Sequence, residues 1–162
     1  MLASDLPQPL ADELLGRANM VRVSSLNADG TAHMFAAWFA WDGEHVTIST
    51  TDHSRKVRNI RRNPQVSLLI DESDGGLVNR GLLLYGKVDS IEGGDEAVRL
   101  THTICARYMG DVAIDSPAFA AYVEAISPLA ILRISIDKAA HWDTSGAETS
   151  ARAQREAVGP SA

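Results

Sequence analysis

Residues 50–64 read TTDHSRKVRNIRRNP, and this stretch predicts a short helix that carries positive charge from its first turn onward. Pro64 ends the helix, because the residue before a proline is disfavoured in helical geometry. The side chains that can cap the N-terminus are those of Asp52, His53 and Ser54. Arg55 and Lys56 then fall in the first turn, where the helix dipole is already positive and each cation costs roughly 0.3 to 1 kcal/mol. Two cations at this end of a helix predict a bound anion that offsets the cost.

A phosphate is the anion that this segment suits best. It would receive unpaired backbone N–H groups, the Ser54 hydroxyl, the forked guanidinium of Arg55 and the ammonium of Lys56. Thr50 and Thr51 end a strand directly before the turn, where their hydroxyls can meet a phosphate or the edge of a ring. Threonine is also a common strand residue, so ordinary strand structure is the alternative for these two.

The alternative for the whole charge run is a solvated helix face. At about 100° per residue, Val57 and Ile60 point to one side of the helix and the basic side chains gather on the other. Arg61 and Arg62 lie in the last turn, where they complement the negative helix end. We therefore assign the solvated face to these two arginines and the phosphate to the pair in the first turn.

The composition places this basic segment in an otherwise acidic chain. With 162 residues, 45% hydrophobic and 22% charged, the chain fits one compact domain. Its formal net charge of −6 argues against nucleic acid or an anionic membrane as a general partner. Five of the fifteen lysines and arginines nevertheless lie between Arg55 and Arg62, with no acidic residue among them. The basicity is local, as expected for a small anionic ligand.

Several functional classes are excluded or disfavoured by what the sequence lacks. Cys105 is the single cysteine, which rules out an internal disulfide framework and fits a reducing cytoplasm. The N-terminus lacks a secretory pattern, and no apolar run reaches 18 residues, so we expect a soluble cytoplasmic protein. The five histidines are scattered, so we expect no metal site. The strings G-x-S-x-G, G-x-x-x-x-G-K-[ST] and G-x-G-x-x-G do not occur.

The hydrophobic pattern predicts a mainly β fold. We expect six strands, at residues 20–26, 31–41, 45–50, 65–71, 80–92 and 129–142. The segments 27–30 (NADG) and 42–43 (DG) are hairpin signals, which favour antiparallel neighbours. We expect helices at residues 10–18, as a short lid, at 117–126, and after an Asp95 cap. Six strands with a few peripheral helices indicate an antiparallel β-barrel in residues 1–143, and the polar, aperiodic tail 144–162 is expected to be disordered.

Aromatic residues cluster on one expected strand, at Trp38, Phe39 and Trp41, and Trp142 closes the last strand. Trp38 and Phe39 must face opposite sides of the sheet, because successive side chains alternate. Core or interface packing accounts for any single one of them, and stacking on a planar cofactor is the alternative that stays open.

Residues 49–71 (STTDHSRKVRNIRRNPQVSLLID) and 80–92 (RGLLLYGKVDSIE) together resemble the pyridoxamine 5′-phosphate oxidase-like family of split-barrel flavoproteins. The motifs are S-R-K, then N-P-x-V-S-L-L, then an apolar strand ending in G-K, and the resemblance covers residues 20–92, with a looser match in the last strand. It implies a split β-barrel homodimer with FMN in the groove between the subunits. It also implies that the FMN phosphate is held by Thr50, Ser54, Arg55 and Lys56.

The chain departs from the true oxidases of that family in its second strand. Aligned without gaps from Ser54, Met34 and Phe39 stand where those oxidases carry an arginine and a lysine. Their C-terminal tryptophan-containing segment and Arg-x-His signature are also missing, since this chain continues as AAHWDTSG. We therefore do not expect oxidation of pyridoxamine phosphate. The chain is more similar to short members of the superfamily that bind FMN or the deazaflavin F420.

The leading hypothesis is an FMN-dependent oxidoreductase that transfers a hydride to or from a small molecule. An F420H2-dependent reductase is the alternative within the enzyme class; the acidic tail of F420 would need further cations, available at Arg58, Arg61, Arg62 and Arg80. A non-catalytic flavin carrier or sensor is the alternative of another class, because no residue stands out as a general acid or base. Tyr85, His33 and Trp142 are candidates for ring contact or substrate positioning. The predicted cofactor-binding set is Thr50, Thr51, Ser54, Arg55, Lys56, Arg80 and Trp142.

Overall fold

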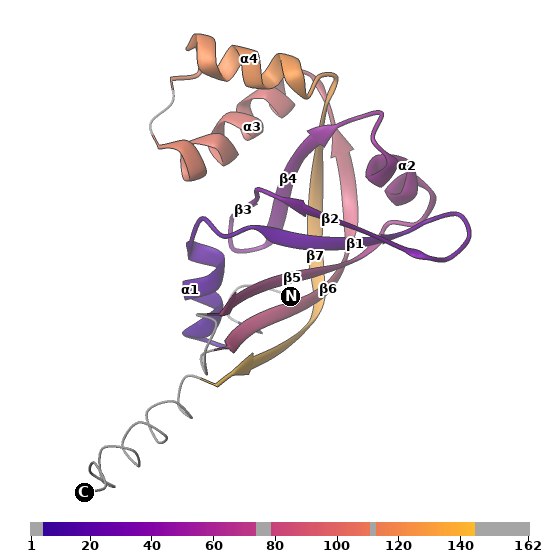
Figure 1. Ribbon diagram of the computed structural model, residues 1–162, viewed down its shortest axis with the longest axis vertical. Helices are drawn as coiled ribbons and strands as arrows, with labels where there is room; N and C mark the ends of the chain where they lie inside the picture. The colour runs from indigo at the N-terminus through magenta and orange to yellow at the C-terminus, as the bar shows by residue number, and fades with distance from the viewer. Residues whose placement is uncertain (1–4, 74–78, 111–112, 145–162) are drawn as a thin grey trace, which may run out of the picture.

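The structure is a computed structural model that describes residues 5–73, 79–110 and 113–144. Its strands are β1 (Val21–Leu26), β2 (Ala32–Ala37), β3 (Ala40–Trp41), β4 (His45–Thr51), β5 (Gln65–Ser73), β6 (Asn79–Glu92) and β7 (Leu129–Asp143). Its helices are α1 (Leu10–Gly16), α2 (Arg55–Arg62), α3 (Gly94–Met109) and α4 (Pro117–Ala125). Figure 1 shows one strongly curled sheet, with α3 and α4 together at one end and α1 beside β5 and β6 toward the other.

The seven strands form one antiparallel sheet in the order β2-β1-β5-β6-β7-β4-β3. Strands β2 and β3 are its two edges, yet only Trp38 and Phe39 separate Ala37, the end of β2, from Ala40, the start of β3. Three Cα steps span at most about 11 Å. The sheet must therefore curl until its edges nearly meet, which confirms the predicted mainly β, barrel-like class.

The expected single strand over residues 31–41 is divided in two, which raises the strand count from six to seven. At the break, the backbone N–H of Phe39 donates to the Tyr108 hydroxyl at 3.2 Å, and the Trp38 ring stacks on the Tyr108 ring with centroids 4.9 Å apart. The Phe39 side chain is fully buried, so it faces the core while Trp38 faces α3. A partner 69 residues away in the sequence leaves no trace in the local alternation pattern, which is why the break was not predicted.

The curled sheet encloses the main core. The largest fully buried side chains are Phe39, Leu14, Leu15, Ile48, Leu68, Ile70, Leu82, Leu84, Ile104, Ile131, Leu132 and Ile134. Helix α1 contributes its apolar face to this core through Leu10, Ala11, Leu14 and Leu15. The Arg107 guanidinium of α3 donates to the carbonyl oxygens of Leu15 and Arg17, and these bonds fasten the end of α1 to the body of the domain.

Helix α2 forms where it was predicted. The Ser54 side chain accepts a hydrogen bond from the Val57 N–H at 3.4 Å, and no acidic residue lies in the first turn. Val57 and Ile60 are buried, as the periodicity predicted. Helix α3 differs in its start, because Gly93 rather than Asp95 occupies the N-cap position.

Strands β6 and β7 form the long backbone of the sheet, and their ladder contains two irregularities. At one of them a Cβ on Gly86 would lie 2.0 Å from the carbonyl oxygen of Ser135, so only glycine fits there. The hairpin turns before β2 and β4 use Gly30 and Gly43 at positive φ, as their sequence signals predicted. The predicted tail lies outside the described residues except for Thr144. None of the described helices is long and apolar enough to cross a membrane.

Candidate anion and ring site beside helix α2

The site is built where β4 ends and α2 begins. Thr50 and Thr51 are the last residues of β4, held in the sheet by pairing with Ala130 and Leu129 of β7. Two residues follow in a tight turn before the Ser54 cap, whose backbone N–H donates to the Thr51 carbonyl oxygen at 3.1 Å. The strand end and the helix N-terminus are therefore rigidly connected, and five of the predicted cofactor-binding residues lie within residues 50–56.

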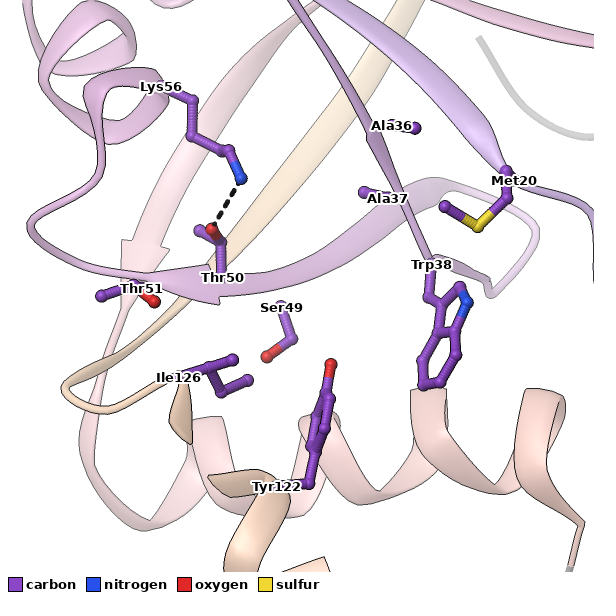
Figure 2. Close-up of a pocket in the computed structure, with 10 residues that line it drawn as sticks. All are labelled: Met20, Ala36, Ala37, Trp38, Ser49, Thr50, Thr51, Lys56, Tyr122 and Ile126. Atoms are coloured by element: carbon purple, nitrogen blue, oxygen red, sulfur yellow. Dashed lines mark hydrogen bonds between the residues drawn. The ribbon is translucent and has the colours of Figure 1, made fainter. Parts of the chain in front are cut away.

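Lys56 points from α2 toward the end of β4, as Figure 2 shows. Its Nζ donates to the Thr50 Oγ1 at 3.2 Å and lies 4.6 Å from the centroid of the Phe35 ring. Burial lowers the pKa of Lys56 from its usual value of 10.5, because the partly desolvated ammonium loses favourable contact with water. Within the described residues no carboxylate lies within 4 Å of this ammonium. The cation is thus half-buried with an aromatic ring and a neutral hydroxyl as neighbours.

Arg55 is exposed at the same helix end, and it forms no hydrogen bond or ion pair within the part of the chain that the structure describes. The other three basic residues of α2 are committed to internal partners. Arg58 donates to the His53 carbonyl oxygen at 2.6 Å, Arg61 pairs with Asp52 at 2.5 Å, and Arg62 donates to the Leu26 carbonyl oxygen at 2.5 Å. Arg55 and Lys56 are therefore the two cations of the helix that remain available to a ligand.

Ser54, Arg55 and Lys56, at the N-terminus of α2, are called the cradle below. A pocket of about 360 Å³ opens directly beside it. It is lined by Met20, Ala36, Ala37, Trp38, Ser49, Thr50, Thr51, Lys56, Tyr122 and Ile126, drawn in Figure 2. Its volume lies in the range of small-molecule sites. Lys56 is the one charged side chain of this lining, and no carboxylate belongs to it.

Aromatic rings form the end of the pocket away from Lys56. Trp38 stacks on Tyr108 of α3 with an interplanar angle of 7° and on Tyr122 of α4 at 5.9 Å and 20°. The Tyr108 hydroxyl donates to the Asn19 carbonyl oxygen at 2.6 Å, which anchors the row of rings in the fold. Burial raises the pKa of Tyr122, so its hydroxyl stays protonated and neutral.

The structure does not bring two predicted residues, Arg80 and Trp142, to this pocket within one chain. Thr50 pairs with Ala130 of β7, whereas Gly81 pairs with Trp142 of the same strand. The two pairs are therefore twelve residues apart along β7, which is about 40 Å of strand. The Arg80 guanidinium is held by the carboxylates of Glu13 and Glu72, at 2.7 and 3.0 Å. The Trp142 Nε1 donates to the Asn79 Oδ1 at 2.7 Å. Cofactor contacts by these two residues stay a prediction, and they would require a second copy of the chain.

The outer face of the sheet carries a second group of residues named from the sequence. Met34, Ser24, Ser67 and Tyr85 are directly opposite one another on β2, β1, β5 and β6, so they form one row on one face. Met34 is 61% exposed and Tyr85 is 39% exposed. The row also borders two shallow pockets. It therefore offers an accessible, partly apolar surface outside the barrel.

Sequence reasoning missed the contribution of α4 to the pocket. Tyr122 and Ile126 come from a helix with no recognisable motif, and Met20 and Ser49 also lacked a signal. Trp38 did have a sequence signal, because it belongs to the aromatic cluster for which stacking on a cofactor was one of the two interpretations. Among the described residues, no group of three or more histidine, cysteine, aspartate or glutamate side chains is arranged to hold a metal ion.

The curled antiparallel sheet and the basic helix entry after β4 define a split β-barrel protein. The family model of pyridoxamine 5′-phosphate oxidase matches residues 8–143, and the chain belongs to this family. The resemblance seen in the motifs is thereby confirmed. No curated protein sequence matches the chain significantly.

Solved structures with the same fold include proteins of different function. A conserved hypothetical protein from Mycobacterium tuberculosis has a TM-score of 0.72 and 24% identity, with 86% of each chain covered. An F420 reductase has a TM-score of 0.67 and 26% identity, with 83% of this chain and 98% of that chain covered. The heme storage protein HutZ from Vibrio cholerae has a TM-score of 0.63 and 17% identity, covering 84% and 93%. The fold is therefore shared by proteins that handle unrelated cofactors.

Proposed function

We propose that this protein is a flavin-dependent oxidoreductase that holds the phosphate of FMN at the N-terminus of α2. One observation carries the proposal: Arg55 and Lys56 have no acidic partner among the described residues, and they stand at a positive helix end beside an open pocket. A half-buried ammonium without a counter-ion is unfavourable, and a phosphate would remove that cost.

The roles of the cradle residues follow from their positions. Lys56 and Arg55 neutralise the phosphate, and the Ser54 hydroxyl and the first N–H groups of α2 donate to its oxygens. Thr50 and Thr51 border the path from the phosphate into the pocket. The flavin supplies the hydride chemistry when bound, while the protein binds, orients and shields it. The substrate is a small molecule that reaches the pocket from solvent.

The proposed assembly is a homodimer in which the outer row of β2, β1, β5 and β6 packs on a second copy. The exposed Met34 and Tyr85 side chains support an interface there. A second copy would also bring its own Arg80 and Trp142, which lie far from the cradle of their own chain. Contacts of Arg80 and Trp142 with the cofactor would require such a second copy.

An F420H2-dependent reductase is the second candidate. The F420 reductase with 26% identity, of which 98% is covered, supports it. F420 and FMN share a phosphate-bearing ribityl chain, so the same cradle suits both. A tail of glutamates would have to compete with the internal partners of Arg58, Arg61 and Arg62. That competition is the reason we place FMN first.

A flavin carrier or sensor without rapid turnover is the candidate from another class. The described lining of the pocket offers Lys56 and Tyr122 as its ionisable groups and contains no carboxylate or histidine. Steady-state reduction of a panel of quinones, nitroaromatics and enones separates the two classes. Turnover of any of them above the rate of free flavin supports the enzyme.

The cradle is tested by titrating FMN and riboflavin, which lacks the phosphate, against purified protein. We expect Arg55→Ala and Lys56→Ala each to weaken FMN binding by about 10- to 100-fold, because a charge-assisted hydrogen bond contributes about 1.5 to 3 kcal/mol. Riboflavin binding should not change. The same titration with F420 decides which cofactor binds the parent protein more tightly.

Arg99→Ala is the matched control, since it removes one positive charge from an exposed position of α3 that pairs with Glu96. It should leave both affinities unchanged. Equal FMN affinity in the parent and in both cradle variants would contradict the proposed phosphate site.

A further inference from the structure

The pocket beside α2 has two chemically different ends. Lys56 and the two threonines form one end, and Trp38 and Tyr122 form the other, with Ala36 and Ala37 along the wall between them. Small side chains along this wall leave its volume open. A ligand that matches both ends carries an anionic group at one extremity and an apolar, planar group at the other.

The aromatic end is preorganised. The rings of Tyr108, Trp38 and Tyr122 form one stacked row that joins α3, the β2–β3 connection and α4. The Tyr108 hydroxyl is fixed at both sides, since it donates to Asn19 and accepts from the Phe39 N–H. A rigid wall loses little conformational entropy when a ring packs against it. The two tyrosines therefore differ, because the Tyr108 hydroxyl is hydrogen-bonded within the fold whereas Tyr122 lines the pocket.

The Tyr122 hydroxyl has no hydrogen-bond partner among the described residues. Figure 2 shows its oxygen directed away from α4 and into the space in front of Ser49. The Ser49 hydroxyl, in contrast, is paired with Thr101 at 2.7 Å. Packing of α4 needs only the ring of residue 122, which phenylalanine would supply equally well. The hydroxyl therefore requires a different explanation.

The charge of the lining indicates what this hydroxyl would bind. A neutral phenol donates one hydrogen bond, and the pocket contains one cation and no carboxylate. Such surroundings favour an acceptor edge that is neutral or negative, and they disfavour a cationic ligand. Carbonyl oxygens and ring nitrogens on a planar heterocycle meet this requirement.

We infer that the aromatic end of the pocket is the binding site for the planar ring of the cofactor, with Trp38 and Tyr122 as its wall and the Tyr122 hydroxyl as a hydrogen-bond donor to the polar edge of that ring. This inference deepens the proposed function and depends on it. It assigns to α4 a role that the phosphate cradle does not include: recognition of the ring irrespective of the phosphate.

The test compares FMN with riboflavin in two variants. Tyr122→Phe retains the stacked ring and removes only the hydroxyl, so it should weaken both flavins by the same factor, about three- to ten-fold. It should also shift the absorption band of the bound flavin, because the ring loses a hydrogen bond. Lys56→Ala should weaken FMN and leave riboflavin unchanged. The ratio of the FMN affinity to the riboflavin affinity therefore distinguishes a loss of ring recognition from a loss of phosphate recognition.

Glu124→Gln is the matched control, because it alters an exposed side chain on the same helix two residues from Tyr122. Thermal unfolding checks that all variants are folded. Unchanged flavin affinities and spectrum in Tyr122→Phe, together with weaker FMN binding in Lys56→Ala, would overturn the ring site and leave the proposed function intact. Unchanged FMN binding in Lys56→Ala would overturn the proposed function itself. If neither flavin binds, F420 and the corresponding phosphate-free deazariboflavin replace them, and failure of that pair to bind overturns both.

Discussion

At the scale of single residues, Lys56 has the most unusual surroundings. Its ammonium is partly desolvated between the Thr50 hydroxyl and the Phe35 ring, and burial lowers its pKa. A bound phosphate would raise the pKa again, because the opposite charge favours the protonated form. The desolvation cost of this ammonium is the reason that we expect an anion to bind beside it.

The lowered pKa predicts a pH dependence for phosphate recognition. Lys56 attracts the phosphate only while protonated, so the preference for FMN over riboflavin should fall as the pH rises, and the fall should begin below the ordinary lysine pKa of 10.5. Ionisation of the flavin ring affects both ligands equally and cancels in the ratio. Lys56→Arg is the control, since a guanidinium stays charged throughout. A ratio that is flat with pH in the parent protein would argue against a direct contact between Lys56 and the phosphate.

At the scale of elements, the position of α2 depends on Asn59, which is buried beneath it. Its Nδ2 donates to the Asn27 Oδ1 at 3.0 Å and to the Ser25 Oγ at 3.4 Å, and its Oδ1 accepts from Arg62. These bonds hold the helix against the β1–β2 turn. Because the cradle is the first turn of α2, the same bonds also determine where the cradle stands relative to the pocket.

Replacing Asn59 by alanine should destabilise the protein by about 1 to 3 kcal/mol, because buried polar partners lose their hydrogen bonds. Chemical denaturation measures this loss. Hydrogen exchange should report earlier opening of α2 than of β6 and β7. Asn63→Ala is the comparison, since the side chain of this residue at the C-terminal end of α2 accepts one local hydrogen bond from the Gln65 N–H. Equal stability of the two variants would show that α2 is held by its apolar face alone.

At the scale of the whole molecule, the outer row on β2, β1, β5 and β6 is the surface that distinguishes a monomer from the proposed homodimer. Met34 is the most exposed large apolar residue in the described chain, at 61%. An apolar side chain with that exposure gains free energy when a second copy covers it. The twofold arrangement would place identical rows against each other.

Met34→Glu should therefore convert the protein to a monomer and weaken FMN binding. An unpaired carboxylate buried at an interface costs several kcal/mol, which raises the dimer dissociation constant about 100-fold or more. Sedimentation equilibrium measures the association state. Met109→Glu is the control, because Met109 is also exposed, at 46%, but belongs to the end of α3. A flavin-saturated monomer of the parent protein would contradict the shared groove.

Much of the fold could be predicted because its signals are local. Ser54 caps α2 within three residues, Val57 and Ile60 repeat at helical spacing, and the turns at Gly30 and Gly43 need positive φ that glycine tolerates. The assignment of Arg55 and Lys56 to an anion also used local information, namely the direction of the helix dipole. Interactions between residues close in sequence leave a pattern that does not depend on the rest of the chain.

Other features depended on contacts between distant residues. The Tyr108 hydroxyl bonds the backbone at the break between β2 and β3 from 69 residues away, and Tyr122 reaches the pocket from α4. The sequence alone therefore identified the family, the order of the strands along the chain and the basic helix entry. Tertiary packing determined the curling of the sheet, the internal pairing of three of the five cations of α2, and the aromatic end of the pocket, because each arises from partners that no local periodicity encodes.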